Sequence, residues 1–289
     1  MDRAGFEQLY ERGELNESAP ALACISAREL QKKQLPPIRF IVNGLIPAGL
    51  SILASPPKYG KSWMVLDLCL AVASGRDFLG YGTNQCAALY LAFEDSERRL
   101  KSRMSKLLYG RDAPENIYFS TSAPALDGGL LEVLDSFLAT HRDLGLVVVD
   151  TLQRIRGGAH GRENAYANVY KELATLKGFA DAHNVALLMV HHLRKMGDDS
   201  DPFNRVSGTA GVTGAADTMF VLSKERRSDN TAKLSIVGRD VEGADVVLQF
   251  DKSSCRWLNL GDSDAYEAEQ RRQEYLSSPI TLTIKKLLD

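Results

Sequence analysis

Long apolar runs, closely spaced cysteines and a strong net charge are all missing from this sequence of 289 residues. No stretch approaches the ~20 apolar residues that span a bilayer, so we expect no membrane segment. Residues 1–7 lack the pattern of a signal peptide. The four cysteines lie far apart, without the spacing of a disulfide frame or a zinc site: Cys24, Cys69, Cys86 and Cys255. These absences favour a reducing, cytoplasmic location.

The formal net charge of −2 provides no global basic surface for nucleic acid. Any contact with nucleic acid would therefore have to come from local loops. The length suits one large domain, or one domain with small appendages.

Residues 55–62 read Ser-Pro-Pro-Lys-Tyr-Gly-Lys-Ser, which is the end of a phosphate-binding loop with Ser55 in place of the usual first glycine. The apolar run 50–54 before it suits a buried strand. Residues 63–73 after it have a helical pattern that ends at Gly75. A strand, a loop and a helix in this order are the context that the motif requires.

A helix N-terminus attracts phosphate because its first N–H groups are unpaired and carry partial positive charge. Lys61 is expected to reach the β- and γ-phosphates, and the Ser62 hydroxyl to bind Mg²⁺. The two prolines of the loop have no N–H to donate. The nucleotide-binding groups are therefore expected to come from Lys58, Tyr59, Gly60, Lys61, Ser62 and Trp63. A positive φ at Ser55 would strain a serine.

Buried-strand patterns alternate with helical segments, which predicts an α/β fold with a mostly parallel central sheet covered by helices on both faces. The strands are expected near 50–54, 87–93, 117–119, 144–149 and 185–190. Four further runs are separated by turns and look like antiparallel strands added at the C-terminal edge: 218–222, 232–237, 246–250 and 256–260.

Asp150 ends the most apolar of these strands. A carboxylate at the carboxyl end of a buried strand beside the phosphate-loop strand is placed to hold Mg²⁺ through water. The alternative is an aspartate that caps the segment after it.

Glu94 and Asp95 end the strand at 87–93. ATP hydrolysis requires a group that polarises the attacking water, and we assign this role to Glu94. Asp95 is explained as the N-cap of the helix that follows.

His191 and His192 end the strand at 185–190, where one of them could contact the γ-phosphate and transmit its presence to the loop that follows. The alternative is an ordinary polar strand end. Zinc is disfavoured because adjacent strand residues point to opposite faces.

These positions together resemble the RecA-like P-loop ATPases, in particular the RepA-type hexameric replicative helicases of plasmids, phages and mobile elements. The resemblance covers roughly residues 38–260. It is carried by 57–62, 90–95, 148–151, 191–195, 208–211 and 214–217.

The resemblance implies that Glu94 is the catalytic glutamate, which acts with Lys61, and that His192 is the γ-phosphate sensor. It also implies that loops 154–163 and 193–212 bind single-stranded DNA in the channel of a homo-oligomeric ring.

Such rings insert basic fingers into the neighbouring subunit's site. Arg239 matches the first finger position and is the catalytic residue expected to act across subunits. Val241 stands where the helicases often have arginine.

Three parts are expected along the chain: an N-terminal extension at 1–37, an ATPase domain at 38–262, and a linker helix with the start of a truncated winged-helix region at 263–289. The extension includes a short helix to about residue 34, opened by the capping-box pattern of Ser26 and Glu29.

The leading functional hypothesis is an ATPase motor that acts on DNA. The second is an ATP-gated DNA-binding or regulatory protein that assembles without translocating, which Ser55, Val241 and the acidic run 198–201 favour. A recombinase-type filament is a third hypothesis. A small-molecule kinase fits less well because no lid with clustered arginines is evident.

Overall fold

A computed structural model describes residues 24–156, 165–193, 202–206, 212 and 214–278. The chain divides into two compact units, Met1–Pro37 and Ile38–Asp289. The described part of the first unit contains α2 (Ala27–Lys32), which begins with the predicted capping box: the Glu29 amide donates to Ser26 Oγ at 3.2 Å, and the Ser26 amide donates to Glu29 Oε2 at 3.0 Å. The helix ends before residue 34, and none of its residues is buried.

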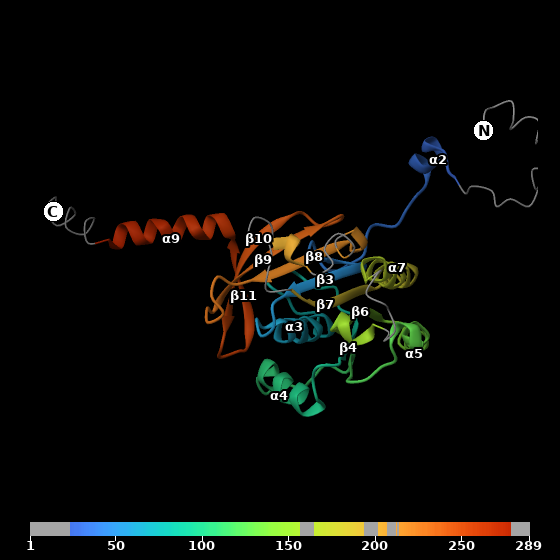
Figure 1. The fold of residues 1–289 in the computed structure, drawn as a ribbon, viewed down its shortest axis with the longest axis horizontal. Coiled ribbons are helices and arrows are strands. Elements are labelled where there is room, and N and C mark those ends of the chain that lie inside the picture. Colours follow the sequence, from blue (N-terminus) through green and yellow to red (C-terminus); the bar gives the residue numbers. More distant parts are fainter. Residues whose placement is uncertain (1–23, 157–164, 194–201, 207–211, 213, 279–289) are drawn as a thin grey trace, which may run out of the picture. The chain divides into compact units, whose positions relative to one another are not determined.

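The second unit is built on a nine-stranded sheet with the order β11-β10-β9-β8-β3-β7-β6-β4-β5 (Figure 1). A small antiparallel pair, β1 (Phe40–Val42) and β2 (Ile46–Pro47), stands outside it. The strands of the main sheet are β3 (Gly49–Ser55), β4 (Ala87–Ala92), β5 (Ile117–Ser120), β6 (Leu144–Asp150), β7 (Ala186–His192), β8 (Thr218–Ser223), β9 (Thr231–Gly238), β10 (Ala244–Asp251) and β11 (Arg256–Asp262).

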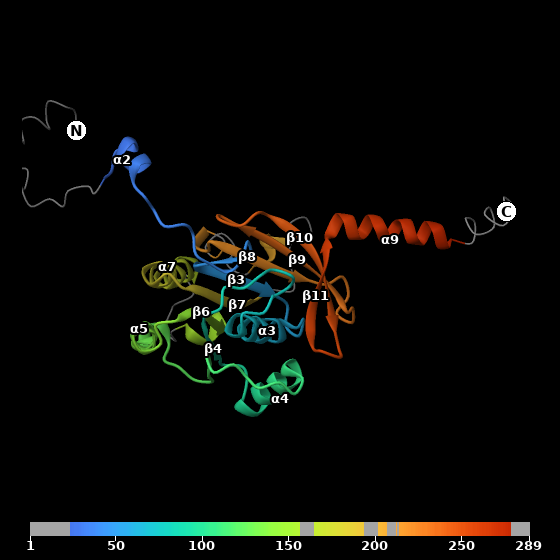
Figure 2. The same cartoon turned by 180° about the vertical axis from the view of Figure 1, so that it is seen from behind.

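Two apolar cores cover the two faces of this sheet. One contains residues of α3 (Lys61–Ser74) and α4 (Glu97–Leu108), and the other contains residues of α5 (Leu130–Thr140), α6 (Leu152–Ile155) and α7 (Ala165–His183). Figure 2 shows α3 and α7 from behind, with the sheet strands between them. The predicted α/β class, with a mostly parallel sheet and helices on both faces, is confirmed.

The position of β8 differs from the sequence-based expectation. It pairs in parallel with β3, and only β9, β10 and β11 form the antiparallel extension. A parallel partner requires a long crossover, and residues 193–217 supply one between β7 and β8. The short turns after β8 instead bring each later strand back in the opposite direction.

The strand that ends at Asp150 also lies one place further from the phosphate loop than expected. β7 pairs with both β3 and β6, so it separates them. The pattern along the chain identifies buried strands, but their order across the sheet depends on how the crossovers pack.

Asp95 is not the N-cap of α4. The cap is Ser96, whose hydroxyl accepts from the Arg99 amide, while the Asp95 carboxylate pairs with Arg99 and Arg103. A serine immediately before the helix competes for the same role, and two arginines one and two turns along the helix hold the aspartate elsewhere.

The chain leaves the sheet through α9 (Ser263–Ser277), whose residues contact β10 and β11. Asp262 caps it by accepting from the amides of Asp264 and Ala265 at 3.0 Å. This agrees with the helix expected from residue 263. The domain division at residue 262 stays a prediction, and the winged-helix expectation for residues 279–289 lies outside the described residues.

Candidate nucleotide-binding site

The loop between β3 and α3 has the strand–loop–helix geometry that its sequence predicts. Ser55 is the last residue of the strand, is fully buried, and is not among the residues with positive φ. The left-handed conformations fall instead on Lys58, at φ 69°, and on Gly60, at φ 98°. The substitution of serine for the usual glycine therefore causes no strain at Ser55, because the tight bend of the loop lies further along it.

Gly60 is the N-cap of α3 and has a second reason to be glycine. A Cβ atom added there would lie 3.0 Å from Cζ2 of Trp257, a residue of β11. The Trp257 indole also donates to the Gly60 carbonyl oxygen at 3.4 Å. The loop is thus braced by a strand from the antiparallel end of the sheet.

Lys61 is the first residue of α3 and is largely buried, with 5% of its surface exposed. Its Nζ donates to the carbonyl oxygens of Ser55 at 2.7 Å and Pro56 at 3.1 Å, and it lies 3.2 Å from Nδ1 of His192. Burial lowers the pKa of Lys61 to about 8, against the opposing charges of Asp150 and Glu94. A cation held in a partly desolvated loop interacts strongly with an incoming phosphate.

Asp150 lies at the end of β6 and accepts two hydroxyl hydrogen bonds on one oxygen. Ser62 Oγ donates to its Oδ2 at 3.1 Å, and the Tyr90 hydroxyl donates to the same atom at 2.9 Å. Burial raises the pKa of Asp150, while the bonds from Tyr90 and Ser62 lower it. The alternative of Asp150 as a cap has no support, since α6 has Thr151 as its N-cap and Asp150 faces the loop helix.

The oxygen atoms of Ser62 and Asp150 suit Mg²⁺, a hard cation that prefers oxygen ligands and retains several waters. Within the described residues, no group of three or more His, Cys, Asp or Glu side chains could hold a metal alone. An ion here would therefore depend on phosphate oxygens and water for its remaining ligands, as Mg²⁺ commonly does at nucleotide sites.

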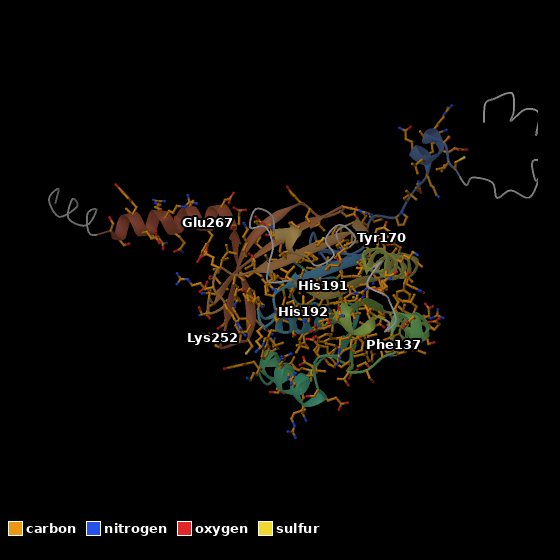
Figure 3. The ribbon with its side chains drawn as sticks, in the orientation of Figure 1. Phe137, Tyr170, His191, His192, Lys252 and Glu267 are labelled. Atoms are coloured by element: carbon orange, nitrogen blue, oxygen red, sulfur yellow. The ribbon has the colours of Figure 1, made fainter. Side chains whose placement is uncertain are left out.

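Glu94 and His192 face each other across the cleft, with Glu94 Oε1 3.4 Å from His192 Nε2 and with about half and a third of their side chains exposed. The Lys61 ammonium has no lone pair, so this contact requires His192 Nδ1 to accept, which leaves Nε2 as the donor toward Glu94. Figure 3 shows His191 and His192 side by side at the end of β7. Of the two, His192 is the one that reaches Lys61 and Glu94, and its role as a sensor stays a prediction.

These groups line a cleft of about 540 Å³ at the carboxyl ends of the parallel strands. Sequence reasoning identified most of its polar lining but missed Asp95, Arg99 and Arg103 as members. Arg103 lies over the ring of Trp63, with its Cζ 5.4 Å from the ring centroid. The two arginines bring positive charge to a site expected to take a polyanion. In the sequence, the sign of their role was the helical spacing of the basic residues of α4. That spacing is equally typical of a helix face exposed to solvent, so it did not by itself indicate a binding site.

Arg239 does not join this cleft. It directly follows Gly238, the last residue of β9, which pairs with Thr218, the first residue of β8. This places Arg239 at the amino ends of the parallel strands, whereas the cleft lies at their carboxyl ends. Its guanidinium lies 3.4 Å from Asp217 Oδ1 and donates to the Gly214 carbonyl oxygen at 3.3 Å. Within one chain, Arg239 is therefore a partner of Asp217.

The two loops expected to bind DNA are described only in part. Arg154 donates to the Phe93 carbonyl oxygen at 3.4 Å, and Arg156 pairs with Glu172 at 2.7 Å. The other arginine and lysine residues of these loops lie outside the residues whose side chains the structure describes: Arg162, Arg194, Lys195 and Arg205. The loops nevertheless leave adjacent strands, because β6 pairs with β7 and both end at the cleft.

A phosphate loop before α3, with Asp150 at the end of β6 and Glu94 after β4, defines a RecA-like P-loop ATPase. A model of the AAA domain family matches residues 17–198, which is more than half of the chain. The chain belongs to this family.

Curated relatives include DNA repair protein RadA. The protein of Mycobacterium tuberculosis is 29% identical over 166 residues, which cover 57% of this chain and 31% of the relative. The protein of Streptococcus pyogenes serotype M6 is 24% identical over 165 residues, which cover 57% of this chain and 32% of the relative. The match thus spans about a third of the length of these relatives.

Two solved structures share the fold. One, described as an ATPase domain, has a TM-score of 0.60 at 15% identity and covers 89% of this chain and 98% of its own. The other, "The Structure Of A DnaB-Like Replicative Helicase And Its Interactions With Primase", has a TM-score of 0.63 at 14% identity and covers 89% of this chain and 71% of its own.

Family membership implies that ATP is the nucleotide and that the domain hydrolyses it. Among the helices that the structure describes, none has the length and apolar character needed to cross a membrane.

Proposed function

We propose that this chain is an ATP- and Mg²⁺-dependent RecA-like ATPase that acts on single-stranded DNA, as a RepA-like helicase in the replication of a plasmid, phage or mobile element. The observation that carries the ATPase part is the convergence of Lys61, Ser62, Asp150, Glu94 and His192 on one cleft. These residues come from separate segments of the chain, and each has the chemistry that phosphoryl transfer requires.

In this proposal Lys61 and the first amides of α3 bind the phosphates. Ser62 and Asp150 hold the cation, which would neutralise charge that develops on the phosphate oxygens. Glu94 polarises the attacking water. Its carboxylate is half-exposed and open to the cleft, which suits a group that must accept a water molecule.

His192 supports a coupling between the nucleotide and DNA. It contacts Lys61 and Glu94, and it is the last residue of β7 before the loop at 193–212. A change in its contacts when the γ-phosphate leaves would act on the start of that loop. The loop at 154–163 follows the neighbouring strand and would respond to the same event. The names of RadA and the DnaB-like helicase also associate similar proteins with DNA.

A homo-oligomeric, hexameric ring is the assembly that suits Arg239. The residue lies at the opposite edge of the sheet from Lys61, so only another copy of the chain could bring it to a nucleotide. With 59% of its side chain exposed, the guanidinium is accessible to a second molecule.

One observation favours the alternative, an ATP-gated DNA-binding or regulatory protein that does not translocate. Val241 occupies the second finger position and is buried, so the chain offers one basic finger residue instead of two. A trans arginine can raise phosphoryl-transfer rates by about 10³–10⁵-fold, so losing part of this device would slow a motor.

The test is the ATPase rate with and without single-stranded DNA for the wild type, Lys61→Ala and His192→Ala, alongside measurements of size with a non-hydrolysable ATP analogue. We expect DNA-stimulated hydrolysis that Lys61→Ala abolishes. His192→Ala should bind ATP but lose the stimulation. Strand separation that proceeds without ATP would contradict a motor, and an ATPase rate indifferent to DNA would contradict the coupling through His192.

A further inference from the structure

Tyr90 carries a polar hydroxyl and packs within one of the two apolar cores. It lies in the middle of β4 and has no exposed surface. Its ring packs edge-on against Phe119 of β5, with the ring centroids 6.2 Å apart. A phenylalanine would fill the same space. The hydroxyl therefore needs its own explanation, because burying a hydroxyl is costly unless it is hydrogen-bonded.

The partner of that hydroxyl is Asp150, across 60 positions of sequence, at 2.9 Å. Ser62 donates to the same carboxylate oxygen from α3. Two hydroxyls from different elements thus converge on one oxygen atom. A carboxylate held in this way cannot rotate freely about its terminal torsion.

We propose that Tyr90 is a positioning residue for the metal–nucleotide complex: it fixes the Asp150 carboxylate so that the carboxylate can receive the water shell of the cation. This inference rests on the proposed function, since it concerns the same site. A hydroxyl such as that of Ser62 can donate its hydrogen to Asp150 while its oxygen binds a cation. The Ser62–Asp150 hydrogen bond is therefore compatible with a bound cation. Tyr90 holds the same carboxylate through a separate hydrogen bond that does not involve Ser62.

Burial supports this role. Asp150 is itself buried, with 3% of its surface exposed, so its carboxylate depends on hydrogen bonds inside the protein. The Tyr90 hydroxyl supplies one of the two that side chains donate to it, and the Ser62 hydroxyl supplies the other.

The test is Tyr90→Phe, which removes the hydroxyl and keeps the ring. Mn²⁺ serves as a spectroscopic probe for the cation, and its affinity for the protein bound to a non-hydrolysable ATP analogue is measured by electron paramagnetic resonance. We expect that affinity to fall about tenfold, the lower end of the effect of removing a group that orients a metal ligand. Affinity for the analogue in EDTA should change less than about twofold, because the phosphate-loop donors remain.

The matched control is Tyr118→Phe in β5. It deletes a hydroxyl from a ring that packs against Phe137 and His141 on the other side of the sheet. This variant should bind Mn²⁺ as the wild type does. Thermal unfolding checks that both variants fold; if Tyr90→Phe did not, Tyr90→Met would be measured in its place.

The outcomes separate the two proposals. A wild type that binds the analogue no better with Mn²⁺ than with EDTA would overturn the proposed metal-dependent function. Wild-type Mn²⁺ binding with an unchanged affinity in the folded Tyr90 variant would overturn the role of Tyr90 alone. An equal loss of affinity with and without metal would also overturn it, because that result indicates a general disturbance of the loop.

Discussion

Trp257 donates its indole hydrogen to the carbonyl oxygen of Gly60 at 3.4 Å, which connects the antiparallel end of the sheet to the phosphate loop. Lys224 lies over the same indole ring, with its Nζ 5.2 Å from the ring centroid, and over the ring of Tyr59 at 5.9 Å. The nucleotide loop therefore rests on residues that follow it far along the chain. Its conformation depends on the C-terminal strands as well as on its own sequence.

Gly60→Ala should reduce ATP affinity by about 5- to 150-fold. Alanine at φ 98° is strained, by about 1–3 kcal/mol for a sparsely populated backbone region, and its Cβ would press on the Trp257 ring. Isothermal titration with ATP and Mg²⁺ measures the loss. The double variant with Trp257→Leu separates the two causes: because the backbone strain does not depend on the ring, affinity should stay below that of Trp257→Leu alone. If the double variant bound ATP as tightly as Trp257→Leu alone, the loss of affinity would come from the contact with the Trp257 ring and not from backbone strain.

ATP affinity should fall as the pH rises above about 8. Lys61 in the free protein has a pKa of about 8 because it is desolvated, and bound phosphate would raise that pKa by favouring the ammonium form. Below this pKa the lysine is already charged, so few protons are taken up when ATP binds. Above it binding must protonate the lysine, and affinity should weaken by up to about tenfold per pH unit until the pKa of the complex is reached.

Calorimetry in two buffers of different ionisation enthalpy counts the protons taken up on binding. We expect uptake that increases from about one pH unit below the Lys61 pKa to about one unit above it. An affinity and a proton count that are both flat across this range would contradict a lowered pKa of Lys61 in the free protein.

Glu94→Gln should preserve ATP binding and slow hydrolysis by about 10²–10⁴-fold, the usual contribution of a positioned general base. Glutamine can still accept from His192 Nε2 but cannot take a proton from water. Single-turnover hydrolysis measures the chemical step, and Glu97→Gln in the first turn of α4 is the matched control. A Glu94→Gln protein that keeps its DNA-dependent function would favour the regulatory alternative over the motor.

Asp217→Ala should destabilise the fold by about 1–3 kcal/mol. The Asp217 carboxylate accepts from the buried Leu50 amide at 3.0 Å, and its loss would leave that donor unsatisfied. It also pairs with Lys177 at 2.5 Å. Asp217→Asn retains an acceptor for Leu50 and should cost less.

The control for Asp217 is Asp245→Ala, which breaks a surface pair with Lys233 in which both side chains are more than 40% exposed. Such pairs contribute at most about 1 kcal/mol. Urea unfolding compares the three variants. Equal midpoints for Asp217→Ala and Asp245→Ala would show that the Leu50 contact does not contribute as argued.

Local patterns predicted the secondary structure closely. The helix after the phosphate loop ends at Gly75 because that residue adopts a left-handed C-cap, and Ser26 opens α2 through a capping box. The predicted strands agree with the observed ones to within a residue or two at each end. Asp95 was misassigned because Ser96 is an equally good cap, and because only the packing of α4 shows that Arg99 and Arg103 pair with the Asp95 carboxylate.

Short-range patterns were sufficient to predict the phosphate loop, the α/β class and the polar strand ends at Glu94, Asp150 and His192, because these depend on neighbouring residues and on the edge at which parallel strands end. The packing of the chain was needed to place β7 between β3 and β6, to make β8 parallel, and to bring Tyr90 and Trp257 to the site. Those features depend on how crossovers bring together segments far apart in the chain, where no local pattern specifies which side chains will meet.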